Sequence, residues 1–254
     1  MVDRVTLYRA PTTVADADAI AGWLDGRVDA AVSVRDRFLS LYADDALAED
    51  FAAARVLSPY ERETGNTMLG IVRYEERTIE EPERGGGVIY DGLAVQELLG
   101  RRIPEAERGL DHLHVPLLDR VVGTWGDHDG RWHKRVAVLG QPGLVSVPGL
   151  YEAPAKPEQY YKEQQKHALL SGGAPPREVL ENEVEGEFLV ADDPRTTEAL
   201  KGYVLAAYHY LEMGEDFCEE SGCRLANPHR QPGVVKAQLR DPEFCPAHVE
   251  RYRP

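Results

Sequence analysis

Two short apolar runs decide the fold prediction: Val5-Thr6-Leu7-Tyr8 and Ala30-Ala31-Val32-Ser33-Val34. Both have the length and the β-branched content of strands. Between them, Asp16 to Leu24 carries apolar residues at helical spacing, and Asp36 to Leu57 does the same after the second run. A β-α-β-α order is typical of a sheet covered by helices. We therefore predict an α/β protein with a mixed central β-sheet flanked by helices.

The rest of the chain continues this alternation. Further strands are expected at residues 69–75, 88–90, 112–118, 132–139, 144–147 and 187–190. Further helices are expected at 94–99, 158–170, from Arg177, at 196–213 and from Pro232 to Leu239. The turn-rich segment 123–130 is expected to close a hairpin between the strands at 112–118 and 132–139. A linker at 171–176 separates an N-terminal α/β region (1–174) from a C-terminal helical region (175–254), and we expect one continuous domain.

The composition argues against several classes of function. The 254 residues carry a formal net charge of −15. DNA and RNA phosphates repel so acidic a chain, and we expect no nucleic-acid partner. No run of about 18 apolar residues is present, so no membrane-spanning segment is expected. Met1-Val2-Asp3-Arg4 has no apolar signal core, which predicts a cytoplasmic protein.

All three cysteines lie close to the C-terminal end, in the pattern Cys218-x4-Cys223-x21-Cys245-x2-His248. Two close ligand pairs separated by a longer arm are the usual arrangement of a structural zinc site. Three thiolates and one imidazole complete a tetrahedron, and they leave no open position for catalysis. His229 lies between the two pairs and is an alternative fourth ligand. Three buried free thiols without a metal are the simpler interpretation.

The residues around this pattern resemble the archaemetzincins, a metzincin-type family of metallopeptidases. That family carries H-E-x-x-H-x-x-G-x-x-H-C-x4-C-x-M, followed by a cysteine pair near P-E-F-C-x-x-C. Gly214, Cys218 and Cys223 fall in register with the first motif, and Pro242-Glu243-Phe244-Cys245 matches the second. The resemblance covers residues 207–248 and implies a metzincin-like fold, an archaeal source and a C-terminal helical segment held by zinc.

The departures from the family motif fall on its catalytic site. The three zinc-binding histidines, the catalytic glutamate and the Met-turn residue are replaced, in that order, by Ala207, Leu211, Phe217, Tyr208 and Leu225. A catalytic zinc needs three protein ligands and an open position for water, and alanine, leucine and phenylalanine have no lone pairs to offer. The resemblance therefore carries over only the structural zinc ligands, with His248 where the family has cysteine. It implies a non-catalytic relative, a pseudo-peptidase that binds a protein or peptide partner.

Other histidines leave a second hypothesis open. His112, His114, His128 and His133 lie close together in the sequence, with several aspartates between them. Imidazoles and carboxylates can hold a divalent metal, whose bound water would make the protein a metal-dependent hydrolase. Ordinary polar residues of a hairpin are the alternative interpretation. His209 and Glu212 lie three residues apart on the helix expected at 196–213, as a further candidate metal pair or a local contact.

Overall fold

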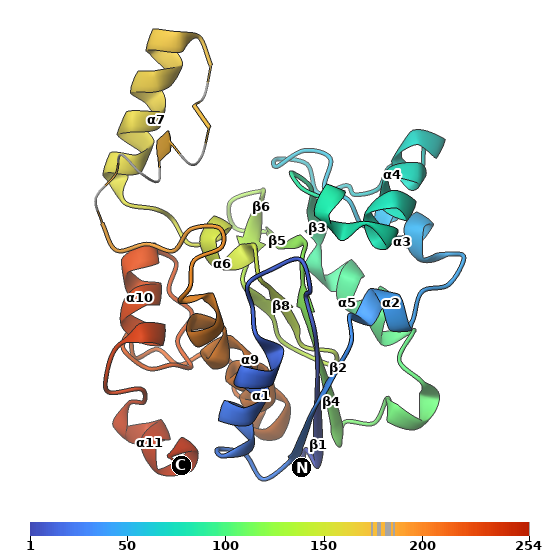
Figure 1. Ribbon diagram of the computed structural model, residues 1–254, viewed down its shortest axis with the longest axis vertical. Coiled ribbons are helices and arrows are strands. Elements are labelled where there is room, and N and C mark those ends of the chain that lie inside the picture. The colour runs from blue at the N-terminus through green and yellow to red at the C-terminus, as the bar shows by residue number, and fades with distance from the viewer. Residues whose placement is uncertain (174, 177–178, 181–183, 185, 254) are drawn as a thin grey trace.

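The computed structural model has a mixed sheet at its centre and helices on both faces (Figure 1). It describes residues 1–173, 175–176, 179–180, 184 and 186–253. The start of the helix expected from Arg177 and the proposed boundary at residue 174 lie outside the described residues.

The main sheet has five strands in the order β2-β1-β4-β8-β7. Their bounds are Arg4–Tyr8 (β1), Ala31–Arg35 (β2), His112–Leu118 (β4), Ala137–Val138 (β7) and Leu144–Ser146 (β8). β2, β1, β4 and β8 run parallel to one another, and the edge strand β7 is antiparallel to β8. A smaller sheet contains Ile89–Asp91 (β3), Val121–Gly126 (β5) and Arg131–Arg135 (β6). The predicted mixed sheet is confirmed.

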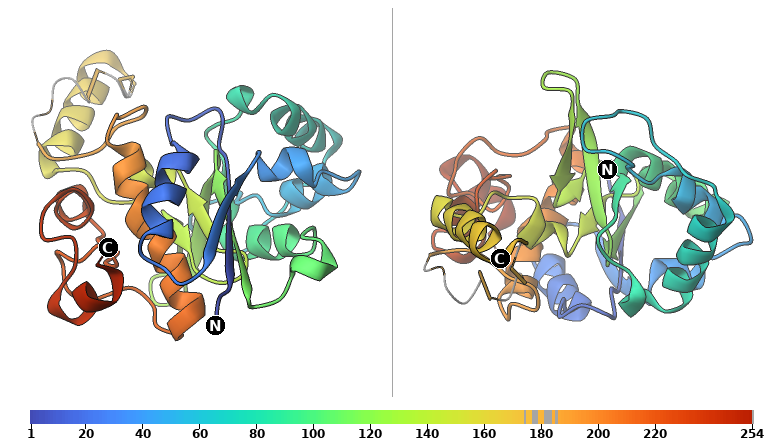
Figure 2. Two further views of the ribbon diagram at one scale, coloured as in Figure 1. Left: turned by 60° about the horizontal axis from the view of Figure 1, so that its bottom comes forward. Right: turned by 90° about the horizontal axis from the view of Figure 1, so that it is seen from above.

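Side chains that alternate along β1 divide the core into two parts, because successive strand residues point to opposite faces. Val5 and Leu7 pack with α1 (Ala17–Asp25) and α9 (Thr196–Met213) on one face. Tyr8 packs on the other face. That face is covered by α2 (Phe38–Leu41), α3 (Leu47–Ala53) and α5 (Gly92–Gly100) (Figure 2).

The C-terminal helices lie beside α9 and complete the first part of the core. α10 (Gln231–Leu239) packs on α9, and α11 (Pro246–Tyr252) follows it. Val234 and Tyr252 belong to the same core cluster as Val5, so the two sequence regions share one core. Two helices follow β8: α6 (Gly149–Glu152), and α7 (Glu158–Ser171), which projects away from the rest of the molecule (Figure 1).

The strand expected at 69–75 is wrong, because these residues begin α4 (Leu69–Glu80). The run from Leu69 to Tyr74 has β-like composition, but the helix places Glu75 and Thr78 on one buried face. There Arg120, far away in the sequence, bonds both side chains. A tertiary contact therefore overrides the local preference.

Three other expectations are corrected by the structure. The long helix expected at 36–57 is broken into α2 and α3, and Asp44 Oδ1 accepts the backbone N–H of Ala46 between them. The hairpin joins β5 to β6, so residues 112–118 are not its first strand. Residues 187–190 form no strand, and the N–H of Leu189 bonds the side chain of Gln231. Two short 3₁₀ turns, Pro82–Arg84 and Glu105–Glu107, complete the described elements.

None of the helices in the described part of the chain combines the length and the apolar composition needed to cross a bilayer.

Candidate metal centre

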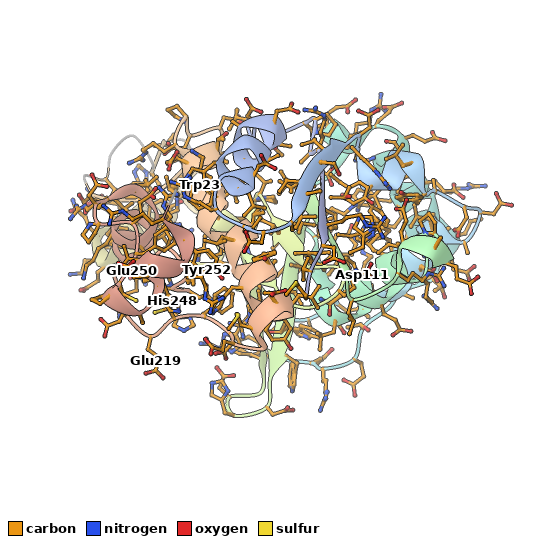
Figure 3. The ribbon with its side chains drawn as sticks, turned by 90° about the horizontal axis from the view of Figure 1, so that it is seen from below. Trp23, Asp111, Glu219, His248, Glu250 and Tyr252 are labelled. Carbon is orange, nitrogen blue, oxygen red and sulfur yellow. The ribbon has the colours of Figure 1, made fainter. Side chains whose placement is uncertain are left out.

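Cys218, Cys223, Cys245 and His248 meet in one cluster, which we call the Cys–His centre. The first two lie in the loop after α9, where the N–H of Cys218 bonds the carbonyl of Leu225. Cys245 is the N-cap of α11, and His248 lies in the first turn of that helix. Figure 3 shows His248 and Tyr252 on α11, beside α9. The predicted ligand set is thus brought together from two separate loops.

The distances within the Cys–His centre fit a tetrahedral zinc ion. Cys218 Sγ lies 3.9 Å from Cys245 Sγ, and His248 Nδ1 lies 3.1 Å from Cys245 Sγ and 3.6 Å from Cys223 Sγ. Zinc bonds of about 2.3 Å to sulfur and about 2.0 Å to nitrogen place tetrahedral neighbours about 3.8 Å (S to S) and about 3.5 Å (S to N) apart. The Cys218–Cys245 and Cys223–His248 separations match these values within about 0.1 Å, the Cys245–His248 separation is about 0.4 Å shorter, and the four donors lie close enough together for one ion.

Burial disfavours the thiolate form at two of the three cysteines. Burial raises the pKa of the Cys223 thiol to about 12, and burial also raises the pKa of Cys218. Burial acts on Cys245 in the same direction, but the backbone N–H groups of Ala247 and His248 outweigh it, so the pKa of Cys245 lies below its usual range. A bound dication reverses the penalty of burying thiolates, because metal binding deprotonates the ligand.

His229 is not a member of the Cys–His centre in the described structure. Its carbonyl accepts the N–H of Ala155, which ties the start of α10 to the segment before α7. The geometry favours His248 over His229 as the fourth ligand.

His209 and Glu212 do not form the expected pair. His209 Nδ1 lies 2.6 Å from the Tyr252 hydroxyl, and its Nε2 lies 3.3 Å from a carboxylate oxygen of Glu215. Burial lowers the pKa of His209, with His248 adding to the effect. Glu212 instead accepts the N–H of Val2 at 2.6 Å. His209 therefore anchors α11 to α9, and Glu212 anchors the start of the chain.

The sequence resemblance places Ala207, Tyr208, Leu211, Phe217 and Leu225 at the catalytic motif, and in the structure these side chains pack in or against the core. Ala207 and Leu225 are fully buried, Tyr208 is nearly so, and all three belong to the main core. Leu211 and Phe217 are partly buried against the same core. These side chains contain no carboxylate or imidazole group that could hold a catalytic metal.

The sequence matches a family model over nearly its whole length. The family model described as "Family of unknown function (DUF7001)" matches residues 6–251. The chain belongs to this family. No curated protein matches the sequence of this DUF7001 chain.

Two solved structures are similar to the DUF7001 chain. One is the zinc-dependent peptidase from Methanocorpusculum labreanum (strain Z), with a TM-score of 0.49 and 11% identity, covering 97% of this chain and 98% of that chain. The other is archaemetzincin (amzA) from Methanopyrus kandleri, with a TM-score of 0.46 and 13% identity, covering 98% and 92%. The metal chemistry of the DUF7001 chain has to follow from its own residues.

The four histidines of the second hypothesis are divided between two places. His112 and His114 lie on β4 in a group with Glu107, whereas His128 and His133 lie on the β5–β6 hairpin in a group with Asp129. The four side chains therefore form no single cluster. Sequence reasoning missed Glu107, because it approaches β4 from the loop after α5.

His114 is held by hydrogen bonds at both ring nitrogens. Its Nδ1 lies 2.7 Å from the Tyr8 hydroxyl, and its Nε2 lies 3.0 Å from the carbonyl of Glu107. Burial lowers its pKa to about 4. His112 contacts Thr6 Oγ1 at 2.9 Å. Both nitrogens of His114 are therefore already used, and the pair on β4 serves as a polar contact within the core.

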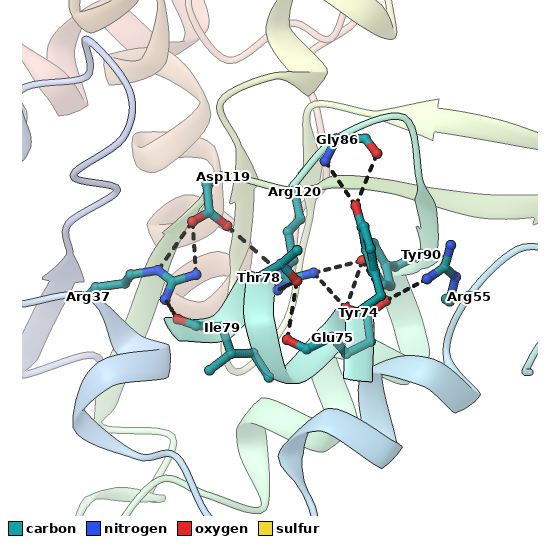
Figure 4. A network of polar contacts seen from close by, with 10 residues as sticks. All are labelled: Arg37, Arg55, Tyr74, Glu75, Thr78, Ile79, Gly86, Tyr90, Asp119 and Arg120. Atoms are coloured by element: carbon teal, nitrogen blue, oxygen red, sulfur yellow. Dashed lines mark hydrogen bonds and ion pairs between the residues drawn. The ribbon is translucent and has the colours of Figure 1, made fainter. Parts of the chain in front are cut away.

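A buried ion-pair network in the DUF7001 fold was also missed. It lies at the carboxyl end of β4, where Asp119 pairs with Arg37 at 2.9 Å, and Arg120 pairs with Glu75 at 2.9 Å (Figure 4). The charges come from α4, from the two residues between β4 and β5 and from the residue before α2. Single charged residues in the sequence give no signal for such a network, because each partner lies tens of residues away.

Proposed function

We propose that this protein is a zinc-stabilised binding protein, a non-catalytic relative of archaemetzincin-type metallopeptidases. In this proposal one zinc ion occupies the Cys–His centre and has a structural role. The observation that carries the proposal is the meeting of four donor atoms, three thiols and one imidazole, within 4.8 Å of one another. A zinc ion with four protein ligands has no position for water or substrate.

The position of the Cys–His centre supports a structural role. α11 is seven residues long, and Tyr252 is its only fully buried side chain. An isolated helix of this length is not stable in water. Two of the four ligands, Cys245 and His248, lie in its first turn. Zinc would therefore join α11 to the loop after α9, where apolar packing alone is sparse.

The occupancy of the motif positions supports a non-catalytic role. Ala207 is fully buried against the sheet, and Tyr208 replaces the catalytic glutamate. Without ligands for a catalytic zinc at these positions, the function left to such a scaffold is binding. We propose a protein or peptide as the partner, because the related scaffolds are peptidases.

Metal content and two matched histidine variants test this proposal. After a chelator wash, the wild-type protein is expected to retain one zinc per chain and to show no peptide hydrolysis. Cys245→Ser and His248→Ala are expected to lose the zinc and to melt at a lower temperature, since the metal contributes to folding. His229→Ala, which removes an imidazole outside the Cys–His centre, is expected to keep the zinc and the wild-type melting temperature.

Two results would contradict the proposal. Zinc retained in both Cys245→Ser and His248→Ala would place the metal elsewhere. Peptide hydrolysis by the zinc-loaded wild type that disappears in His248→Ala would show that the centre is catalytic.

A further inference from the structure

The tip of the β5–β6 hairpin carries two histidines and a carboxylate that are independent of the Cys–His centre. The hairpin projects beyond the rest of the molecule (Figure 2, right). Gly126 is paired with Arg131, and Thr124 with His133, so the turn consists of residues 127–130. His128 and Asp129 lie in this turn, and His133 lies on β6.

Both imidazoles point their Nε2 atoms at the same carboxylate oxygen. His133 Nε2 lies 2.9 Å and His128 Nε2 lies 3.7 Å from Asp129 Oδ1. The two rings are nearly parallel, with an interplanar angle of 14° and centroids 5.8 Å apart. Metal bonds of about 2.1 Å place adjacent ligand atoms about 3.0 Å apart in octahedral and about 3.4 Å apart in tetrahedral geometry. The three donor atoms lie within 4.8 Å of one another, and the exposed His128 side chain is free of core packing that would prevent its adjustment towards a shared ion.

Gly126 makes the space in which this cluster sits. A Cβ atom at this position would lie 2.5 Å from Asp129 Oδ1 and 2.8 Å from His133 Nε2. Its φ angle lies outside the left-handed region, so the backbone itself does not require glycine here. A Cβ atom at this position would therefore force Asp129 or His133 to move, because their side chains occupy its place.

Arg131 orients the carboxylate without covering the shared oxygen. Its Nε lies 2.7 Å from Asp129 Oδ2, which leaves Oδ1 for the two imidazoles. Hydrogen bonds to the second oxygen of a ligating carboxylate are a common way to fix its orientation. Asp127, the neighbouring carboxylate, pairs with Arg62 instead.

We propose that His128, Asp129 and His133 form a second metal site, which takes an exchangeable divalent transition-metal ion. Two imidazoles and one carboxylate suit Zn²⁺, and also Ni²⁺ and Cu²⁺. Three protein ligands leave at least one coordination position open. Because the tip is exposed, this ion exchanges with solvent, in contrast to an ion in the Cys–His centre.

Titration of the full-length protein with ZnCl₂ after a chelator wash tests the proposal by calorimetry. The wild type is expected to take up one further zinc per chain. Asp129→Asn, His128→Ala and Gly126→Ala are each expected to weaken this uptake at least about 10-fold, because each removes a ligand or fills its space. Asp127→Asn is the matched control. Asp127 lies two residues before Asp129 in the same turn and pairs with Arg62, so this variant is expected to bind zinc as the wild type does.

The hairpin provides a local readout as well. Trp125 and Trp132 contact one another in the hairpin, with ring centroids 5.8 Å apart. Ni²⁺ or Cu²⁺ bound at the tip is expected to quench their fluorescence in the wild type and in Cys245→Ser, and to quench it less in Asp129→Asn. His128 is 80% exposed, so His128→Ala removes a ligand without disturbing the core.

Three outcomes would overturn the proposal. They are an absence of exchangeable zinc in the wild type, equal weakening in Asp127→Asn and Asp129→Asn, and loss of the exchangeable zinc in Cys245→Ser alone. The last outcome would assign all the binding to the Cys–His centre. Loss of the tight zinc in Cys245→Ser with the tip site retained would instead separate the two sites.

Discussion

Replacing Glu75 by glutamine is expected to destabilise the fold strongly, although the change is isosteric. Glu75 is fully buried, and its two carboxylate oxygens bond Arg55 at 3.0 Å, Arg120 at 2.9 Å and the Tyr90 hydroxyl at 3.0 Å. Glu75→Gln keeps the shape but removes the negative charge. Arg120, only 7% exposed, is then left without its main counter-charge.

The size of this effect follows from the burial of Arg120. Removing one partner of a buried ion pair costs about 3–5 kcal/mol, because the remaining charge is uncompensated. Asp119 still lies 3.9 Å from Arg120 Nε, and Arg55 is partly exposed, so we expect the lower end of this range. For a chain of this size, about 3 kcal/mol lowers the melting temperature by roughly 6–12 °C.

Chemical and thermal denaturation of three variants test this reasoning. Glu76→Gln, at the exposed position next along α4, is the control and is expected to stay within about 0.5 kcal/mol of wild type. The double variant Glu75→Gln/Arg120→Met removes the stranded charge, and we expect it to be more stable than Glu75→Gln alone. A loss below about 1 kcal/mol in Glu75→Gln, or a double variant less stable than the single one, would refute the argument from uncompensated charge.

Two further predictions concern the core. Burial lowers the pKa of His114 to about 4 in the fold, whereas its pKa in the unfolded chain is about 6.5. The contribution of neutral His114 to the free energy of unfolding is therefore fully present above pH 6.5. It falls as the pH drops towards 4, by at most about 3 kcal/mol. Denaturant titrations between pH 7 and pH 4 measure this slope, and His114→Gln is expected to flatten it. Ala207→Leu is expected to destabilise by about 1–3 kcal/mol through overpacking, which a melting curve measures. A variant as stable as wild type would show that the site has room for a larger side chain.

The elements that sequence analysis predicted well are those whose signals are local. The strands at β1, β2 and β4 and the helix at α9 follow from periodicity over a single segment. The four residues of the Cys–His centre were found because each ligand pair is close in sequence. Short-range spacing was sufficient for both.

What could not be predicted depends on partners that are distant in the sequence. α4 looks like a strand until Arg120 is known to lie opposite Glu75. β5 was missed because its two glycines merge with the turn residues 127–130 that follow it, and its strand pairing with β6 appears only in the structure. Glu107 and Glu215 join histidine groups across loops, and no motif marks them. Carboxylates are common in so acidic a chain, so their presence near a histidine in the sequence carries little information.

The contact between α9 and the sheet leaves little room for a larger, ligating side chain at position 207. A Cβ atom at Gly143, in the loop between β7 and β8, would lie 2.8 Å from Ala207 Cβ. The helix therefore rests on the sheet at a distance that only glycine and alanine permit. An imidazole at position 207 would have to displace α9 from β8, and that displacement would disrupt the packed core. The loop after α9 and the start of α11 are free of this constraint, and the four donors of the Cys–His centre converge there. In this chain the close packing of α9 on the sheet and the absence of a ligating side chain at position 207 are two aspects of one arrangement.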